Sequence, residues 1–162
     1  MCNKAYLREA TRASGTSHSL ADMPSHLKRG LAFNEVLDKQ VAAEEHDNRY
    51  VVWKFGRTSH FTIGIVSDIL SDYRAISGVI SDELMVKDPN RDCQFVHYGD
   101  SGSLVWDADG YVSALVWGGK EGSFVTYVTP IEYVLEDIQR ACNAKDVRLV
   151  VRKEDKTAVS IH

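Results

Sequence analysis

The sequence predicts a mainly β protein with an amphipathic helix on either side of the strands. Short apolar runs over residues 103–106, 111–117 and 123–128 are separated by turns that contain Asp, Glu and Gly, which is typical of antiparallel strands. Apolar residues recur at helical spacing in the segments 22–48 and 131–141 instead. At 162 residues, the chain is long enough for one domain with a sizeable core and modest extensions.

The chain begins with two segments that differ in pattern. Residues 1–21 are rich in Ser, Thr, Arg and Ala without clear periodicity, so a flexible segment is expected there. Residues 22–48 are expected to form a helical extension. Its stripe consists of Leu27, Leu31, Val36, Leu37 and Val41. An amphipathic helix must bury such a stripe, and the expected place is the surface of the strands; the alternative is a helix that links two domains of a longer parent.

Turn signals separate the predicted strands. The sequence Asp-Ala-Asp-Gly at 107–110 predicts a hairpin between the first two runs, and Glu121-Gly122 turns the chain into the third. A helix start follows at 129–132, where Thr-Pro-Ile-Glu combines a capping-box pattern with proline at the first helical position. Residues 143–162 are expected to contain a short edge strand at 147–151 and a tail.

The run His97–Ser103 (His-Tyr-Gly-Asp-Ser-Gly-Ser) is the most informative motif of the chain. A serine close to two glycines can lie on a tight, exposed turn whose backbone N–H groups converge on one point. An acyl-transfer nucleophile needs this arrangement, which places an unhindered hydroxyl beside donors for a developing oxyanion. Asp and Gly also occupy ordinary hairpin turns, so a plain turn is the alternative.

The order of these features resembles the second β-barrel of chymotrypsin-like serine proteases, the trypsin superfamily. In that family a Gly-Asp-Ser-Gly loop, here residues 99–102, is followed by two strands, a Trp-Gly segment, another strand and a C-terminal helix. Residues 52–59 and 62–66 also resemble the opening hairpin of that barrel in bacterial and fungal members. The resemblance implies a six-stranded antiparallel Greek-key barrel of chymotrypsin-like type over residues 50–142, its C-terminal helix included.

The resemblance also implies roles around the serine. Ser101 would be the nucleophile, the backbone N–H groups of Gly99 and Ser101 would form the oxyanion hole, and Asp100 would shape the loop. Ser103 stands where many members carry a second glycine, a variation that other members share.

Substrate contacts follow from the same resemblance. Val116, Trp117 and Gly118 would pair with an extended substrate and form the wall of the specificity pocket. Phe95 occupies the place six residues before the serine where members that cut after Arg or Lys carry Asp. The resemblance therefore argues against a preference for basic residues.

The family's general-base His and its orienting carboxylate lie on a first barrel, upstream of the region matched here. Residues 1–49 do not read as six strands and carry no Ala-His-Cys pattern. We therefore expect a truncated serine peptidase domain that turns over peptides poorly or not at all. Two alternatives are a catalytically silent homologue that binds peptides or proteins, and a plain interaction domain in which 99–103 is only a turn.

A histidine within the chain could in principle act as the base. The six are His18, His26, His46, His60, His97 and His162. We expect His97 to line the pocket and His60 to lie at a turn. The pair His26 and Asp22 is the first to inspect, although a structural role is the simpler reading for each histidine.

Composition limits the other function classes. The net charge of −4 gives no reason to expect nucleic acid as a partner, and no apolar stretch reaches membrane-spanning length. Without a visible signal peptide, an intracellular location is expected. Cys2, Cys93 and Cys142 form an odd, dispersed set, so neither a disulfide framework nor a metal site is predicted, and no cofactor is expected. Expected partners are a peptide or protein, with a homodimer or the missing barrel as candidates for the exposed face.

Overall fold

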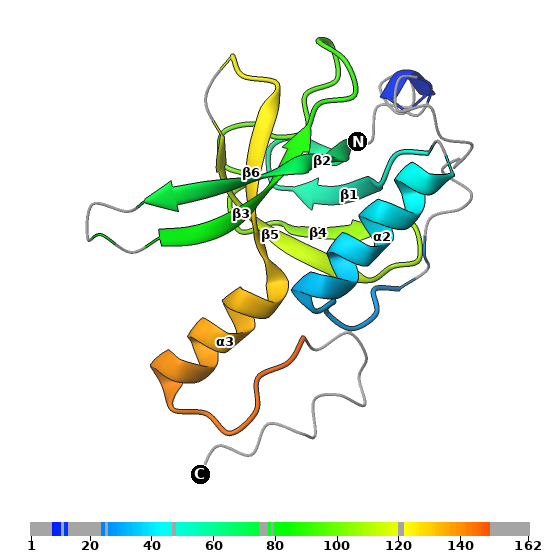
Figure 1. Cartoon of the computed structure of the whole chain (residues 1–162). Helices are drawn as coiled ribbons and strands as arrows, with labels where there is room; N and C mark the ends of the chain where they lie inside the picture. Colours follow the sequence, from blue (N-terminus) through cyan, green and yellow to red (C-terminus); the bar gives the residue numbers. More distant parts are fainter. Residues whose placement is uncertain are drawn as a thin grey trace.

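The computed structural model describes residues 8–10, 12, 24, 26–46, 48–74, 78, 80–119 and 122–149. Six antiparallel strands close into a barrel in the order β1-β2-β3-β6-β5-β4 (Figure 1). They are β1 (Val51–Gly56), β2 (His60–Arg74), β3 (Ile80–Lys87), β4 (Leu104–Asp107), β5 (Val112–Gly119) and β6 (Val125–Pro130). The predicted mainly β fold with a six-stranded antiparallel barrel is confirmed.

The barrel interior is filled by small β-branched residues that alternate along the strands. Val52, Val86, Val105, Val116 and Val128 are almost completely buried in one cluster. Such residues suit a pleated, buried surface, which explains why these segments form strands. The interior leaves little spare room. A Cβ atom on Gly64 would lie 2.3 Å from a Val86 methyl and 2.8 Å from the Phe95 ring, so glycine is required there.

The β2–β3 hairpin extends beyond the barrel (Figure 1). Its pairing shifts register between Val66 and Leu70, and from there the hairpin continues to Arg74 and Ile80. Residues beyond the bulge are largely exposed, in contrast to the buried first half of β2. The bulge therefore separates a barrel part from a projecting arm.

A second apolar cluster lies on the outer face of the barrel. Trp53, Phe61 and Trp106 meet there, with ring centroids 6.0 Å apart for Trp53–Phe61 and 6.3 Å for Phe61–Trp106. Ala10 is fully buried in this cluster, and residues 8–10 and 12 are helical. This part of the segment predicted to be flexible is thus packed; the remainder of residues 1–21 lies outside the described residues.

The helix predicted within 22–48 is shorter than expected. α2 spans Phe33–Glu45, and Val36 and Gln40 are its buried residues, whereas Val41 of the predicted stripe is 54% exposed. The chain before α2 is extended because it pairs with β5: the Leu31 N–H donates to the Val112 carbonyl at 2.8 Å. These backbone bonds replace the helical ones that the apolar spacing had indicated.

The C-terminal helix α3 (Ile131–Cys142) forms where it is predicted, but without the expected capping box. Its N-cap is Pro130, with no side-chain cap hydrogen bond. Glu132 instead accepts the Phe33 N–H at 2.8 Å, which ties α3 to the start of α2, and the Thr129 hydroxyl donates to Glu83 at 2.8 Å. The edge strand predicted at 147–151 is not formed in its described part, 147–149.

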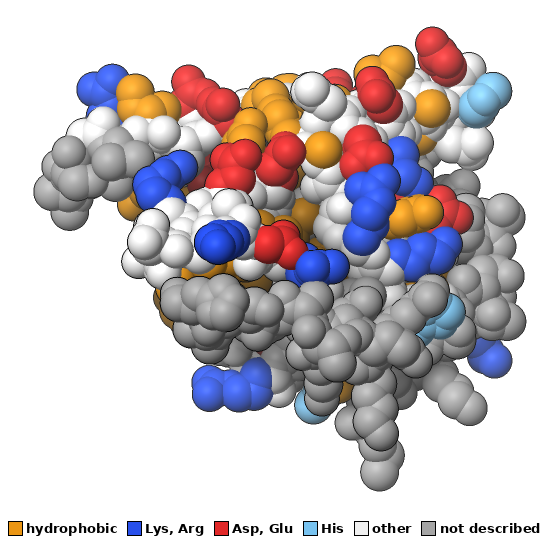
Figure 2. Space-filling view, turned by 90° about the horizontal axis from the view of Figure 1, so that it is seen from below, with side chains coloured by type: hydrophobic (Ala, Val, Ile, Leu, Met, Phe, Trp, Pro, Cys, Tyr) orange, Lys and Arg blue, Asp and Glu red, His pale blue; other side chains and the backbone are white. Residues whose placement is uncertain are grey.

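Two surface properties bear on function. Among the described residues on the face seen in Figure 2, acidic and basic side chains are interspersed. Within the described part of the chain, no helix combines the length and apolar character needed to cross a membrane.

Candidate functional site

The loop of residues 99–103 turns sharply before β4. Gly99 and Gly102 have φ values of +93° and +88°, which side chains disfavour, and the chain doubles back between them. The Gly102 N–H donates to the Val116 carbonyl at 2.7 Å, and the Ser103 hydroxyl donates to the Asp100 carbonyl at 2.6 Å. Strand β5 and the loop's own backbone thus fix its shape.

Asp100 anchors this loop in the barrel. Its carboxylate is completely buried and accepts five hydrogen bonds. The donors are the backbone N–H groups of Thr58 (2.8 Å), Ser59 (3.2 Å) and His97 (3.0 Å), the Ser59 hydroxyl (2.6 Å) and the Lys54 ammonium (3.0 Å). Burial alone would raise the pKa of Asp100, but these donors outweigh it and hold the pKa well below its usual range.

Lys54 points into the barrel from β1. Its side chain is also completely buried, and its ammonium lies between the Asp100 carboxylate, the Ser59 hydroxyl and the face of the Phe95 ring. Burial lowers the pKa of Lys54, and the Asp100 carboxylate opposes this effect. A Cβ atom on Gly56 would lie 2.3 Å from the carboxylate, so glycine is needed for Asp100 to fit.

Ser101 lies at the exposed tip of the same loop. Its hydroxyl donates to the Trp117 carbonyl at 3.2 Å. A hydroxyl has one proton to donate, so in this arrangement the proton is not directed at a base. Among the described residues, the backbone N–H groups of Gly99 and Ser101 have no hydrogen-bond acceptor. Both remain available as the predicted oxyanion donors.

A pocket of about 350 Å³ opens beside Ser101. Trp117, Gly118 and His97 line it. The Trp117 ring contacts two tyrosines: its centroid lies 4.6 Å from that of Tyr73 of the projecting arm, in a tilted arrangement, and 6.1 Å from that of Tyr127, in a stacked one. These two tyrosines lie outside the pocket lining, which combines the rings of Trp117 and Tyr98 with polar side chains and glycine backbone.

Two residues expected in substrate contact lie elsewhere. The side chains of Phe95 and Val116 are completely buried in the barrel interior, and neither residue lines the pocket. Phe95 packs under the Lys54 ammonium, and its carbonyl accepts the Thr62 hydroxyl at 2.7 Å. Its position six residues before Ser101 places it in the core because residues 94 and 96 are the ones facing the pocket.

Asp88 lines the pocket and was not predicted from sequence. It follows β3 directly, and its Oδ1 accepts the Phe95 N–H at 2.9 Å. Burial raises the pKa of Asp88, while the Phe95 N–H and the nearby His97 act in the opposite direction. Local pattern gives no sign of this residue, because its place in the pocket depends on how the end of β3 meets the serine loop.

The histidines are spread over the molecule. The carbonyl of His26 lies beside Gly110, in the turn after β4, and its proposed partner Asp22 lies outside the described residues, as do His18 and His162. His46 is the C-cap of α2. His60 lies at the predicted turn with φ +58°, its ring 5.9 Å from that of Phe55. Phe55 in turn lines a shallow hollow on the other side of Ser101.

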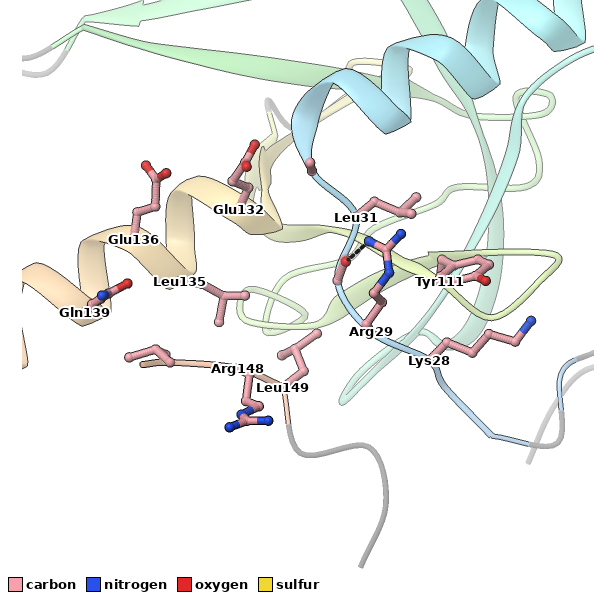
Figure 3. A pocket seen from close by; sticks show the side chains of 13 residues that line it. Lys28, Arg29, Leu31, Tyr111, Glu132, Leu135, Glu136, Gln139, Arg148 and Leu149 are labelled. Carbon is pink, nitrogen blue, oxygen red and sulfur yellow. Dashed lines mark hydrogen bonds between the residues drawn. The ribbon is translucent and has the colours of Figure 1, made fainter. Parts of the chain in front are cut away.

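A larger cavity, of about 780 Å³, lies between α3, the segment before α2 and residues 147–149 (Figure 3). It shares no lining residue with the pocket beside Ser101. Its charged groups are largely engaged: Arg29 pairs with Glu35 at 2.6 Å, Arg148 with Asp146 at 2.7 Å, and Glu132 accepts a backbone N–H. Size alone gives this cavity no chemistry, so the pocket beside Ser101 is the better candidate site.

Neither Cys93 nor Cys142 forms a disulfide, and the described residues contain no group of His, Cys, Asp and Glu side chains that could hold a metal ion. No protein-family profile matches this chain, and no curated protein matches it significantly in sequence.

Proposed function

We propose that this chain presents the nucleophile side of a serine acyl-transfer site, with Ser101 as nucleophile and the Gly99 and Ser101 N–H groups as oxyanion donors. The observation that carries the proposal is the pairing of an exposed hydroxyl with two open backbone donors on a loop anchored from below. Donors fixed before the reaction stabilise developing charge without reorganising, which is a large part of acyl-transfer catalysis.

Among the described residues, no side chain accepts the proton of the Ser101 hydroxyl. Attack of the Ser101 oxygen on a peptide carbonyl carbon forms a C–O bond and expels the amine, and the hydroxyl proton must pass through a base to that amine. The Ser101 hydroxyl donates to a carbonyl instead. We therefore propose that a base comes from another polypeptide segment, in a longer parent or a partner chain, and that the isolated chain hydrolyses peptides poorly or not at all.

The second candidate is a catalytically silent module that binds an extended peptide beside β5. The hydrogen bond of Ser101 to the Trp117 carbonyl favours it, because a hydroxyl held in this way supports the loop without chemistry. The rings of Tyr73, Trp117 and Tyr127, here called the aromatic shelf, would still receive apolar side chains of such a peptide.

Covalent labelling separates the two candidates. In the reaction with a fluorophosphonate, the Ser101 oxygen bonds to phosphorus and fluoride leaves. The proposed function predicts a slow adduct by intact mass that disappears in Ser101→Ala, with Ser103→Ala, whose hydroxyl is tied to the Asp100 carbonyl, as the matched control that keeps it. A folded protein that forms no adduct, or one that survives Ser101→Ala, would contradict the proposal and favour the silent module.

A further inference from the structure

The projecting arm of the β2–β3 hairpin carries apolar side chains that face solvent (Figure 1). Ile69 and Tyr73 of β2 are 59% and 43% exposed, and Ile80 of β3 is 53% exposed. A two-stranded ribbon is only marginally stable in water unless a further strand or a packed face supports it. The arm is therefore a candidate surface for association with another chain.

Both strands of the arm have a free edge among the described strands. The last backbone bond from β2 toward β1 runs from the Val66 N–H to the Tyr50 carbonyl, and residues 68–74 have only β3 beside them. On β3, residues 80–83 precede the pairing with β6, which begins at Leu84. An unpaired strand edge is a template on which another strand can pair.

The two free edges differ in charge. The β3 edge carries Asp82 and Glu83 and no basic residue, so pairing it with its own copy would bring carboxylates together. The β2 edge carries both signs. It contains Asp68, Asp72 and Arg74, and no described acidic side chain forms an ion pair with that arginine. Charge therefore favours the β2 edge for association between copies.

Two copies of the β2 edge fit each other about a two-fold axis at Ser71. In an antiparallel pair with this axis, Asp68 lies opposite Arg74 of the partner subunit, and Ile69 lies opposite Tyr73 of the partner subunit. Symmetry makes each of these pairs occur twice. Opposite charges, and aromatic rings beside β-branched side chains, are stabilising when they face each other across two strands.

Other registers are less favourable on this edge. Residues that face each other in paired strands share one face of the sheet, so the axis must pass through a residue. An axis at Leu70 would place Asp68 opposite Asp72, and an axis at Asp72 would place this residue opposite its own copy. Like charges in these positions are destabilising. An axis nearer either end would pair few of residues 68–74.

We propose that two copies of this chain associate through the projecting arm, with residues 68–74 of β2 paired antiparallel about Ser71. The paired arms form one continuous sheet across the two molecules. An interface of this length is small, so the dimer is weak and reversible, with a Kd on the order of 100 µM. The proposal concerns association alone and is independent of the chemistry proposed for Ser101.

The competing interpretation is that the bulge and the aspartates protect the β2 edge from pairing, as such features do in many sheets. In the monomer, Asp68 contacts Lys87 at 3.5 Å, but both side chains are largely exposed, and such a pair contributes little. Charge reversal separates the two interpretations. Protective charges repel any incoming strand, whereas paired charges need the opposite sign on the partner.

Sedimentation equilibrium of the full chain, from about 10 µM to about 1 mM, measures the association. We expect the average mass to rise from one chain toward two over this range. Arg74→Asp should weaken the dimer at least about tenfold, and Asp68→Arg/Arg74→Asp should restore it to within about threefold. Arg140→Asp on α3 is the matched charge reversal; its side chain is 75% exposed, and the dimer should be unchanged.

A cysteine on the axis tests the register. Opposed residues of an antiparallel pair have Cα atoms about 4.5–5.5 Å apart, which a disulfide can bridge. In a chain with Cys2→Ser and Cys142→Ser, whose remaining Cys93 is buried, Ser71→Cys should form a disulfide-linked dimer under mild oxidation. The control is Ser81→Cys, a second half-buried serine of the arm that lies on β3, which should remain unlinked.

Three results would each overturn the proposal. They are a wild-type chain that stays monomeric at about 1 mM, a double charge variant that associates no better than Arg74→Asp, and equal cross-linking of Ser71→Cys and Ser81→Cys. An equal loss of association in Arg140→Asp would also contradict it, because the effect would then come from net charge. Failure of the proposed function is a separate result, read from the fluorophosphonate adduct on Ser101.

Discussion

Asp100 and Ser101 are neighbours in one loop, yet their surroundings are opposite. The Asp100 carboxylate is completely buried, accepts five hydrogen bonds and pairs with a buried lysine. Ser101 is exposed, and its hydroxyl donates to a backbone carbonyl. The loop's form therefore depends on contacts that also stabilise the barrel. Buried contacts of Asp100 thus fix the shape of the loop, whereas no described side chain accepts the proton of the Ser101 hydroxyl.

The largest expected effect comes from breaking the anchor. Asp100→Asn leaves the buried Lys54 ammonium without a counter-charge, so we expect a loss of about 4 kcal/mol in the free energy of unfolding. Urea unfolding followed by tryptophan fluorescence measures it. Ser101→Ala is the matched control at the tip and should change stability by less than about 0.5 kcal/mol. Similar losses in the free energy of unfolding of Asp100→Asn and Ser101→Ala would contradict the contrast between these two residues.

Removal of the lysine should cost less. In Lys54→Met the Asp100 carboxylate keeps the donors from Thr58, Ser59 and His97, so we expect a loss of about 3 kcal/mol. The double variant Lys54→Met/Asp100→Asn should be about 2 kcal/mol more stable than the sum of the single losses predicts. Additive losses in this cycle would mean that the two side chains do not act as an ion pair.

Lowering the pH should reduce the contribution of the Asp100 carboxylate to the free energy of unfolding. The pKa of Asp100 is lower in the folded protein than in the unfolded chain, where it is about 3.9. Its contribution to stability is therefore present above about pH 4 and is lost as the pH falls through the folded pKa.

Between about pH 4 and pH 2, the free energy of unfolding of the wild type should fall more steeply than that of Asp100→Asn, by up to about 1.4 kcal/mol per pH unit. Unfolding curves at each pH measure the slope. Parallel slopes would show that Asp100 is not ionised preferentially in the folded state.

The smallest of these effects is expected on the projecting arm of β2, where Tyr73 contacts Trp117. Tyr73→Leu removes the ring that contacts Trp117 at 4.6 Å, and a pair of this kind contributes about 1 kcal/mol. Thermal unfolding should show this modest loss. Tyr98→Leu is the control, because Tyr98 is 83% exposed and should change stability little. A loss in Tyr73→Leu as large as that in Asp100→Asn would make the aromatic shelf part of the core.

Local patterns predicted the strands around the serine loop, because the turn at 107–110 and the apolar runs beside it depend on neighbouring residues. The same holds for α3, whose apolar stripe begins at Ile131. Two local predictions were wrong for the same reason. The capping box at 129–132 does not form because Glu132 bonds to α2, and the segment before α2 is not helical because Leu31 bonds to β5. Both partners lie far away in the sequence.

The anchor of the loop was not predicted, because Lys54 and Asp100 are distant in the sequence. One signal was available: Lys54 stands at an inward position of β1, between Val52 and Gly56, where alternation predicts an apolar residue. A lysine at such a position needs a buried anion. Asp88 had no comparable signal, since its role depends on where the end of β3 lies relative to Ser101.

The central claim is that the serine loop is anchored and that no described side chain accepts the Ser101 hydroxyl proton. The most direct measurement is the rate of fluorophosphonate labelling of Ser101 with and without added imidazole, with Ser101→Ala as the blank. A serine site without its base retains about a thousandfold advantage over water, so labelling should be slow and should rise with imidazole concentration. Rapid labelling that imidazole leaves unchanged would place a base within this chain and contradict the account.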